Sequence, residues 1–294
     1  MKRITIIGSE SFLARNYIKY IIENKQSEEY RLFLYDLVDK TNNSVGEYHQ
    51  VDFRKKEDIS EMNYDVDCIF IFAGLTGTVK GFDNFAQYIS ANEILLLNIL
   101  DVYRKRGSTA RIIYPSSRLI YKSNYEAKIA EADEIDLRSI YAVTKYAAEQ
   151  YLKIYHDTYG IDYVVLRICT PIGSIIDSYG NYGTYEIFKN QAINEQSITV
   201  YGDGKQKKTF THIEDICRAF DILVMSDSLN YSEYNLGGQE LCLLDIVKKI
   251  SDEYKVPIKF IDWPEIDQKV DGGSIVFDSS RFDEEFSFSY RDVI

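Results

Sequence analysis

The chain has 294 residues, of which 45% are hydrophobic and 27% charged, a balance typical of a folded protein rather than a disordered one. Its formal net charge of -12 disfavours nucleic-acid binding, and its apolar runs fall short of the roughly 20 residues that a membrane helix needs. The four cysteines and three histidines are scattered. We therefore expect no metal site and a cytoplasmic protein with reduced thiols.

Short apolar runs alternate with amphipathic stretches over the first two thirds of the chain. Nearly continuous apolar runs predict strands that are covered on both faces, and the stretches between them predict helices. This alternation is typical of a Rossmann-type α/β fold with a doubly wound parallel sheet. The expected strands are Ile4–Ile7, Leu32–Tyr35, Cys68–Phe72, Arg111–Tyr114 and Tyr163–Arg167, and the expected helices include Phe12–Glu23, Phe85–Arg104 and Ala142–Tyr159.

The regular alternation of expected strands and helices ends after Pro171. We expect a large domain over residues 1–171, with residues 208–250 packing back on it. Residues 172–207 and 251–294 are expected to form a smaller C-terminal lobe that binds substrate.

A glycine follows the first expected strand and opens the first helix. Gly8 allows a sharp turn there, and the N–H groups at the start of the helix can bind a pyrophosphate. The usual glycine fingerprint would have glycines at 8, 11 and 14, whereas this chain has Ser11 and Ala14 at the last two positions. These small residues still permit close approach of a dinucleotide.

Asp36 ends the second strand. A carboxylate at this position accepts hydrogen bonds from both hydroxyls of an adenosine ribose and repels the 2′-phosphate of NADP. The large domain is therefore predicted to bind NAD.

A tyrosine and a lysine stand four residues apart at the start of an expected helix. This spacing places Tyr141 and Lys145 on one helix face, where the ammonium is expected to lower the pKa of the tyrosine and make it a usable acid and base. The fifth strand ends at Ser116 and Ser117, where a hydroxyl can orient the oxygen that loses its proton.

Several motifs in this order resemble the extended short-chain dehydrogenases/reductases, in particular the NAD-dependent epimerase/dehydratase group. The motifs are Phe72–Leu75, Tyr114–Tyr121, Tyr141–Lys145, Tyr201–Asp215 and Tyr234–Gly237. The resemblance covers almost the whole chain and implies a nucleotide-sugar enzyme. Because the family's active serine or threonine lies four residues before a tyrosine, it favours Ser117 over Ser116.

The resemblance, together with the residue patterns, assigns three groups of site residues. The expected catalytic residues are Ser117, Tyr141 and Lys145. The expected cofactor-binding residues are Gly8, Ser11, Phe12, Leu13, Asp36, Asp52, Phe53, Phe72, Ala73, Gly74, Asn92, Tyr141 and Lys145, and the expected substrate-binding residues are Thr76, Ser117, Arg118, Thr170 and Lys208.

The chain also departs from the family pattern. The 4,6-dehydratases carry Asp-Glu directly after the active threonine, but here these positions are Arg118 and Leu119, which disfavours dehydration by that route. Lys208 replaces an arginine and can contact a diphosphate only as a point charge. Thr170 stands where relatives have an asparagine.

These observations favour an NAD-dependent epimerase that acts by transient oxidation at sugar C4. An NAD(P)-dependent nucleotide-sugar dehydrogenase or a 4-ketosugar reductase would use the same serine, tyrosine and lysine. A third hypothesis is a catalytically silent dinucleotide-binding protein, but the presence of the serine, the tyrosine and the lysine together argues against it. The expected partners are a nucleotide-diphosphate sugar and a second copy of the chain in a homodimer.

Overall fold

The centre of the molecule is a seven-stranded parallel sheet. The computed structural model describes residues 1–294 except 25–27, 42, 44, 177–182, 272 and 294. The strand order is β3-β2-β1-β4-β5-β6-β10, so the direction of winding reverses between β1 and β4, as in a doubly wound Rossmann sheet. The strands are β1 (Lys2–Ile7), β2 (Tyr30–Asp36), β3 (Glu47–Gln50), β4 (Cys68–Ile71), β5 (Arg111–Ser117), β6 (Tyr163–Ile168) and β10 (Glu233–Asn235).

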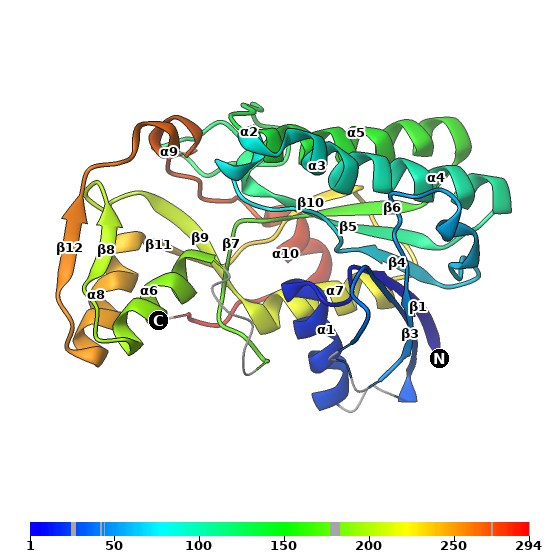
Figure 1. Ribbon diagram of the computed structural model, residues 1–294, viewed down its shortest axis with the longest axis horizontal. Helices are drawn as coiled ribbons and strands as arrows, with labels where there is room; N and C mark the ends of the chain where they lie inside the picture. Colours follow the sequence, from blue (N-terminus) through cyan, green and yellow to red (C-terminus); the bar gives the residue numbers. More distant parts are fainter. Residues whose placement is uncertain (25–27, 42, 44, 177–182, 272, 294) are drawn as a thin grey trace.

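Helices cover both faces of this sheet (Figure 1). The helices α1 (Phe12–Glu23), α7 (Ile213–Met225) and α10 (Ser280–Phe286) pack on one face, with Ile4 and Ile6 of β1 pointing toward them. The helices α4 (Leu95–Arg106) and α5 (Ile140–Tyr159) pack on the other face, against Ile7 of the same strand. Successive side chains of β1 point to apolar layers on opposite faces of the sheet, which explains the continuous run of buried residues in this strand. The sheet covered on both faces confirms the predicted fold class.

The helix expected over residues 85–104 is interrupted. The structure has α3 (Phe85–Ile89), a π-helical turn over Ser90–Ile94 and then α4, preceded by the short α2 (Lys80–Asp83). A π-turn inserts one residue into the helix and redirects the side chains around it. The insertion buries Asn92.

A smaller lobe lies beside the carboxyl ends of the strands (Figure 1). It contains a three-stranded sheet, β11-β9-β7, and a two-stranded parallel sheet, β12-β8. Its elements are β7 (Thr170–Ile172), α6 (Gly183–Ile193), β8 (Ile198–Tyr201), β9 (Lys207–His212), β11 (Gln239–Cys242), α8 (Leu243–Tyr254), β12 (Ile258–Ile261) and α9 (Glu265–Val270).

The helices and strands of the C-terminal half divide between the large sheet and the lobe, according to the apolar cluster in which each packs. Within the expected returning segment, 208–250, α7 and β10 join the large sheet, whereas β9 and α8 belong to the lobe, where Ile246 and Val247 pack with Ile198. Within 251–294, α10 lies on the large sheet through Phe282. Residues 177–182 of the expected lobe lie outside the described part of the chain.

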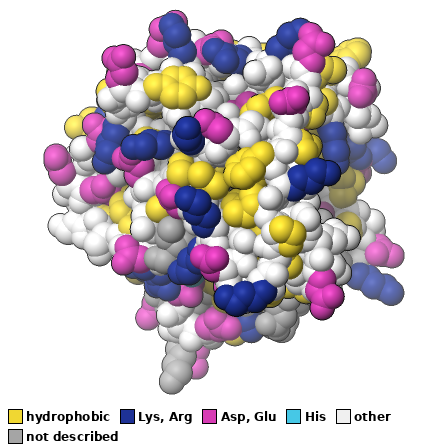
Figure 2. Space-filling model, turned by 90° about the vertical axis from the view of Figure 1, so that its left-hand side faces the viewer, with side chains coloured by type: hydrophobic (Ala, Val, Ile, Leu, Met, Phe, Trp, Pro, Cys, Tyr) yellow, Lys and Arg dark blue, Asp and Glu magenta, His cyan; other side chains and the backbone are white. Residues whose placement is uncertain are grey.

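The outer face of the lobe carries exposed apolar side chains among charged ones (Figure 2). Phe260 of β12 is 51% exposed and Ile266 of α9 is 55% exposed. The helices α6 and α8 pack on the two-stranded sheet β12-β8. None of the described helices is long and apolar enough to cross a membrane.

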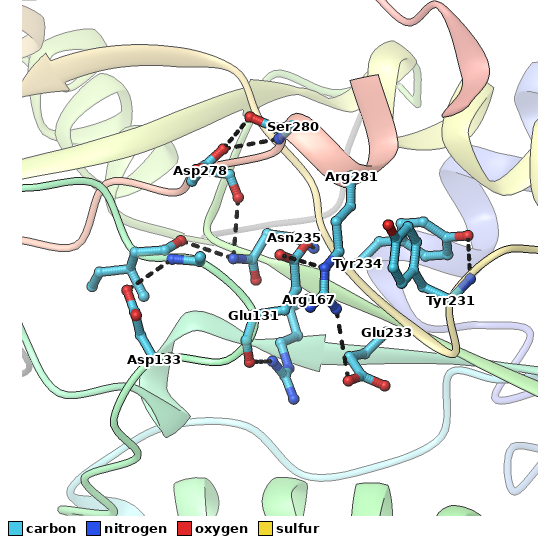
Figure 3. Close-up of polar contacts among 12 residues, drawn as sticks. Glu131, Asp133, Arg167, Tyr231, Glu233, Tyr234, Asn235, Asp278, Ser280 and Arg281 are labelled. Atoms are coloured by element: carbon cyan, nitrogen blue, oxygen red, sulfur yellow. Dashed lines mark hydrogen bonds and ion pairs between the residues drawn. The ribbon is translucent and has the colours of Figure 1, made fainter. Parts of the chain in front are cut away.

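A buried polar network joins five segments: β6, α5, residues 129–135, β10 and α10. Arg167 of β6 donates to both carboxylate oxygens of Glu149 on α5, at 3.2 and 2.7 Å, and to the main-chain oxygen of Glu131 at 2.9 Å. The Glu131 carboxylate accepts from the Asn235 main-chain N–H at 2.7 Å and lies 3.5 Å from Arg281 of α10 (Figure 3). The network fixes α5, the 129–135 segment and the C-terminal helix on the same pair of strands.

The buried pair of Arg167 and Glu149 generates a stability prediction. We expect Arg167→Met to lower the free energy of unfolding by about 3–5 kcal/mol, because Glu149 would remain buried and charged without its partner. The double variant Arg167→Met/Glu149→Met should recover most of this loss. Lys153→Met, which breaks an exposed pair with Asp157, should leave the stability nearly unchanged. Urea unfolding of the four proteins checks this, and a double variant no more stable than Arg167→Met would contradict it.

Candidate active site

The first part of the site is the close approach of β1 to the end of β4. Gly8 follows β1 with a φ of +81°, and a Cβ added there would lie 2.4 Å from the Ala73 main-chain nitrogen. The Gly8 and Ser9 N–H groups donate to the Tyr35 carbonyl at 2.8 and 3.1 Å. Only glycine fits this turn.

The second fingerprint position also points to an anionic ligand. Ser11 is the N-cap of α1, but its side chain makes no capping hydrogen bond, and its Oγ is buried without a partner among the described residues. Buried hydroxyls are normally hydrogen-bonded, and a helix N-terminus attracts phosphate. Ser11 therefore fits a pyrophosphate in place of the missing glycine.

Ser11 lies at the junction of two cavities along the carboxyl ends of the strands. One cavity, of about 410 Å³, has Asp36 on its wall. The Asp36 carboxylate accepts from the Glu10 and Leu37 N–H groups at 2.9 and 2.7 Å. The residues that line this first cavity include the expected cofactor-binding residues Gly8, Ser11, Asp36, Asp52, Phe53, Ala73 and Gly74.

Acidic side chains gather in this first cavity. Glu10, Asp36 and Asp52 all line it, and Arg54 holds Asp52 through two hydrogen bonds of 2.8 Å. Phe53 is 2% exposed and also belongs to the core through its edge contact with Tyr35. A cavity with three carboxylates suits a ribose with free hydroxyls and repels an additional phosphate.

Asn92 lies behind the loop that separates the two cavities. Its Oδ1 accepts from the Leu75 N–H at 2.7 Å, and its Nδ2 donates to the Leu75 carbonyl and the Thr144 hydroxyl at 3.1 and 2.9 Å. A Cβ at Gly74 would lie 2.8 Å from the Asn92 Oδ1. Asn92 thus fixes the loop on α5, and its direct contact with a cofactor stays a prediction.

The second cavity, of about 290 Å³, brings the expected catalytic residues together. Ser117 ends β5, while Tyr141 and Lys145 lie in the first turns of α5, whose N-cap Ser139 accepts a hydrogen bond from the Ala142 N–H at 3.1 Å. Ser117 lies close enough to Tyr141 to lower the pKa of the tyrosine. The predicted residues that line this cavity are Ser11, Phe12, Leu13, Phe72, Gly74, Thr76, Ser117, Tyr141 and Lys145.

Burial shifts the pKa values of both titratable catalytic groups. It lowers the pKa of Lys145 to about 8, opposed by the nearby charge of Glu149. The Lys145 Nζ donates to the Pro115 carbonyl at 2.9 Å and lies 4.4 Å from the centre of the Tyr114 ring.

Burial also raises the pKa of Tyr141 above its usual value, opposed by the Ser117 hydroxyl and the charge of Arg118. The sequence-based expectation that Lys145 lowers this pKa is therefore not met. In the structure Arg118 is the cation that lowers this pKa, and the Lys145 ammonium is directed to a main-chain carbonyl.

Three predicted substrate-binding residues, Arg118, Thr170 and Lys208, are not among the residues that line this cavity. Lys208 of β9 is 4% exposed, and its Nζ lies 3.6 Å from an Asp271 carboxylate oxygen. Burial, followed by the charge of Arg118, lowers its pKa to about 8. Thr170 is buried at the start of β7.

Some residues of the site were missed by the sequence reasoning. Cys169 lines the second cavity and was not expected there. Ser116, which the sequence analysis set aside in favour of Ser117, also lines it, and its hydroxyl is buried without a partner among the described residues. Glu149 was detectable, because it follows Lys145 by one helical turn and faces the same way. Asp271 was not, because only the fold brings it to Lys208. Within the described chain no group of three or more His, Cys, Asp or Glu residues is arranged to hold a metal.

Comparison with known proteins assigns the chain to a family. The sequence profile of the NAD dependent epimerase/dehydratase family matches residues 4–237. This protein belongs to that family. Its cofactor is accordingly NAD, in agreement with the unpartnered Ser11 hydroxyl and the acidic ribose cavity.

Individual relatives are distant but cover most of the chain. A putative UDP-glucose 4-epimerase of Methanocaldococcus jannaschii is 26% identical over 254 residues, 83% of this chain and 81% of the relative. The CDP-paratose 2-epimerase of Salmonella typhi is 26% identical and covers 91% of this chain and 90% of its own length. The structure of a UDP-N-acetylglucosamine 4-epimerase from Methanobrevibacter ruminantium superposes with a TM-score of 0.83 at 22% identity, over 99% of this chain and 94% of that one.

The contact between Gly8 and Ala73 generates a binding prediction. We expect Gly8→Ala to destabilise the protein and to weaken NAD binding at least tenfold, because its Cβ would push β1 away from the loop after β4. Gly107→Ala is the matched control, since Gly107 also has a positive φ, +64°, but no neighbour within 4 Å of an added Cβ. It should lose about 1 kcal/mol and bind NAD normally. Thermal unfolding and NAD titration check both, and equal affinities would contradict the prediction.

The lowered pKa of Lys208 generates a pH prediction. Folded Lys208 loses its proton near pH 8, whereas the unfolded lysine keeps it until about 10.5. Between these values the unfolded state binds more protons, so stability rises with pH. The free energy of unfolding of wild type, relative to that of Lys208→Met, should therefore rise by about 2 kcal/mol between pH 7 and pH 10. Urea unfolding across this range checks it, and a constant difference would contradict it.

Proposed function

We propose that this protein is an NAD-dependent nucleotide-sugar epimerase that acts through transient oxidation at sugar C4. The observation that carries the proposal is that Ser117, Tyr141 and Lys145 line one cavity, and that this cavity also reaches Ser11. A sugar in that cavity would meet an acid/base group and the expected phosphate site of the cofactor together.

The proposed chemistry divides between the cofactor and the chain. NAD, when bound, accepts a hydride from the sugar and returns it. The Tyr141 Oη takes the proton of the sugar hydroxyl, and the Ser117 hydroxyl holds the same sugar oxygen by a hydrogen bond. Arg118 and Lys145 supply positive charge near the developing tyrosinate.

Two features favour epimerisation over dehydration. Elimination of water by the family's dehydratase route needs a carboxylic acid and a carboxylate directly after the active residue. In this chain those positions are Arg118, which is cationic, and Leu119, whose N–H donates to the Ser117 Oγ at 3.2 Å. A leucine side chain cannot transfer a proton.

The substrate side of the proposal rests on charge. Lys208 and Arg118 suit the diphosphate and sugar of a nucleotide-diphosphate sugar, with Thr76 and Thr170 as further contacts. The UDP- and CDP-sugar epimerases among the relatives support this substrate class. Assembly as a homodimer in the cytoplasm stays a prediction.

The test is proton NMR of the purified protein with a panel of nucleotide sugars and no added cofactor. Formation of a C4 epimer is the expected result, because NAD that is reduced and reoxidised in one site needs no replacement. Turnover only with added NAD or NADH would instead identify a dehydrogenase or a reductase.

Tyr141→Phe gives the accompanying prediction. Removal of the phenolic hydroxyl should lower kcat at least a thousandfold, since the sugar proton would have no acceptor, while NAD titration should give an affinity within a few fold of wild type. Tyr155→Phe, on the same helix but outside the cavity, should retain full turnover. Substantial epimerisation by the Tyr141 variant would remove Tyr141 as the base.

A further inference from the structure

A glutamate in the turn between β1 and α1 contacts the loop that follows β2. The Glu10 Oε1 accepts hydrogen bonds from the Thr41 hydroxyl at 2.6 Å and from the Asn43 Nδ2 at 2.7 Å. The Glu10 side chain is 10% exposed, and the residue lines the first cavity together with Asp36. A nearly buried carboxylate therefore joins this loop to the turn over residues 8–11, at the edge of the cavity expected to hold the adenosine ribose.

The same loop forms a wall of the first cavity. Leu37 and Val38 line the cavity, and their side chains are 48% and 44% exposed. Apolar side chains of this kind suit contact with the flat face of an adenosine. The Gln50 Nε2 donates to the Leu37 carbonyl at 3.0 Å, and the Tyr48 hydroxyl donates to the carbonyl of the next residue. The start of the loop is thus anchored on β3.

Glu10 supplies a second anchor, on the opposite side of the loop. Hydrogen bonds to a carboxylate are stronger than those to a neutral acceptor, and here two of them converge on one oxygen. The Asn43 Nδ2 also donates to the Ser9 carbonyl, at 3.4 Å. Because the Glu10 main-chain N–H donates to Asp36 at 2.9 Å, the main chain and the side chain of Glu10 both contact groups that enclose the cavity.

We propose that Glu10 is a positioning residue for NAD: it holds the loop after β2 against the turn over residues 8–11 and thereby slows release of the cofactor. Glu10 acts through Thr41 and Asn43, which keep the wall formed by Leu37 and Val38 in place. Movement of this wall away from the adenosine requires both hydrogen bonds to break, so they add to the barrier to dissociation. The inference concerns the cofactor and is independent of the sugar and of the proposed reaction.

The test measures the rate at which NADH leaves the protein. Protein loaded with NADH is mixed with an excess of NAD, and the decay of bound-NADH fluorescence gives the dissociation rate. We expect Glu10→Ala to raise this rate about tenfold or more, because both hydrogen bonds are lost. Glu10→Gln should stay within about threefold of wild type, since its amide oxygen can accept both.

Glu23→Ala is the matched control. Glu23 lies on α1, where it forms an exposed ion pair with Lys19. Its removal should leave the NADH dissociation rate at the wild-type value, because an exposed pair at this end of the helix does not reach the cavity. Thermal unfolding of each loaded variant verifies that the protein is folded.

A loop variant tests the same contact from the other side. Thr41→Val/Asn43→Ala removes both donors and leaves the Glu10 charge in place, so it should release NADH as fast as Glu10→Ala. Addition of Glu10→Ala to this variant should cause no further acceleration, because the three residues share one interaction. The loop variant carries the same prediction if Glu10→Ala does not fold.

Distinct results would overturn the inference. Equal acceleration by Glu10→Gln and Glu10→Ala would show that the charge of Glu10 acts, and not its hydrogen bonds to the loop. A wild-type dissociation rate in Glu10→Ala or in the loop variant would show that this contact does not retain the cofactor. Additive acceleration in the combined variant would show that Glu10 and the loop act separately.

Discussion

One buried ion pair holds α5, the helix that carries the proposed catalytic residues Tyr141 and Lys145. Arg167 of β6 donates to both oxygens of Glu149, which lies on α5 one turn beyond Lys145 and two turns beyond Tyr141. The pair fixes the height and rotation of α5 relative to the end of β5, where Ser117 meets Tyr141. Because Arg167 also donates to the main chain at Glu131, the same side chain anchors the segment that follows the catalytic serine. A bidentate pair of this kind tolerates little displacement.

Burial has opposite effects on the two kinds of catalytic group. It disfavours the charged form of each, so it raises the pKa of Tyr141 and lowers that of Lys145. A tyrosine that acts as a base therefore needs nearby positive charge, and Arg118 supplies it in the structure. The electrostatic environment of the tyrosine thus depends on a residue at which this chain departs from the family's dehydratases.

The sequence predicted those parts of the molecule that are encoded locally. Strand-to-helix turns, the ends of buried strands and a four-residue spacing on a helix are short-range patterns, so the parallel sheet and the shared cavity of Ser117, Tyr141 and Lys145 were accessible. The short, exposed strand β3 lacks an apolar run, so its bounds could not be predicted from the sequence.

Other features depend on contacts between residues far apart in the chain. The π-turn at Asn92 is fixed by hydrogen bonds to Leu75 and Thr144, and the environment of Lys208 is completed by Asp271. The direction in which Tyr141 shifts its pKa also required the structure. A motif shows that two groups are neighbours, but not how much water surrounds them.

The lobe is assembled from two separate stretches of chain. Its three-stranded sheet joins Thr170–Ile172, Lys207–His212 and Gln239–Cys242, and between the last two the chain returns to the large sheet as α7 and β10. No single cut can release the lobe as an autonomous unit, and it cannot be exchanged between relatives as a cassette.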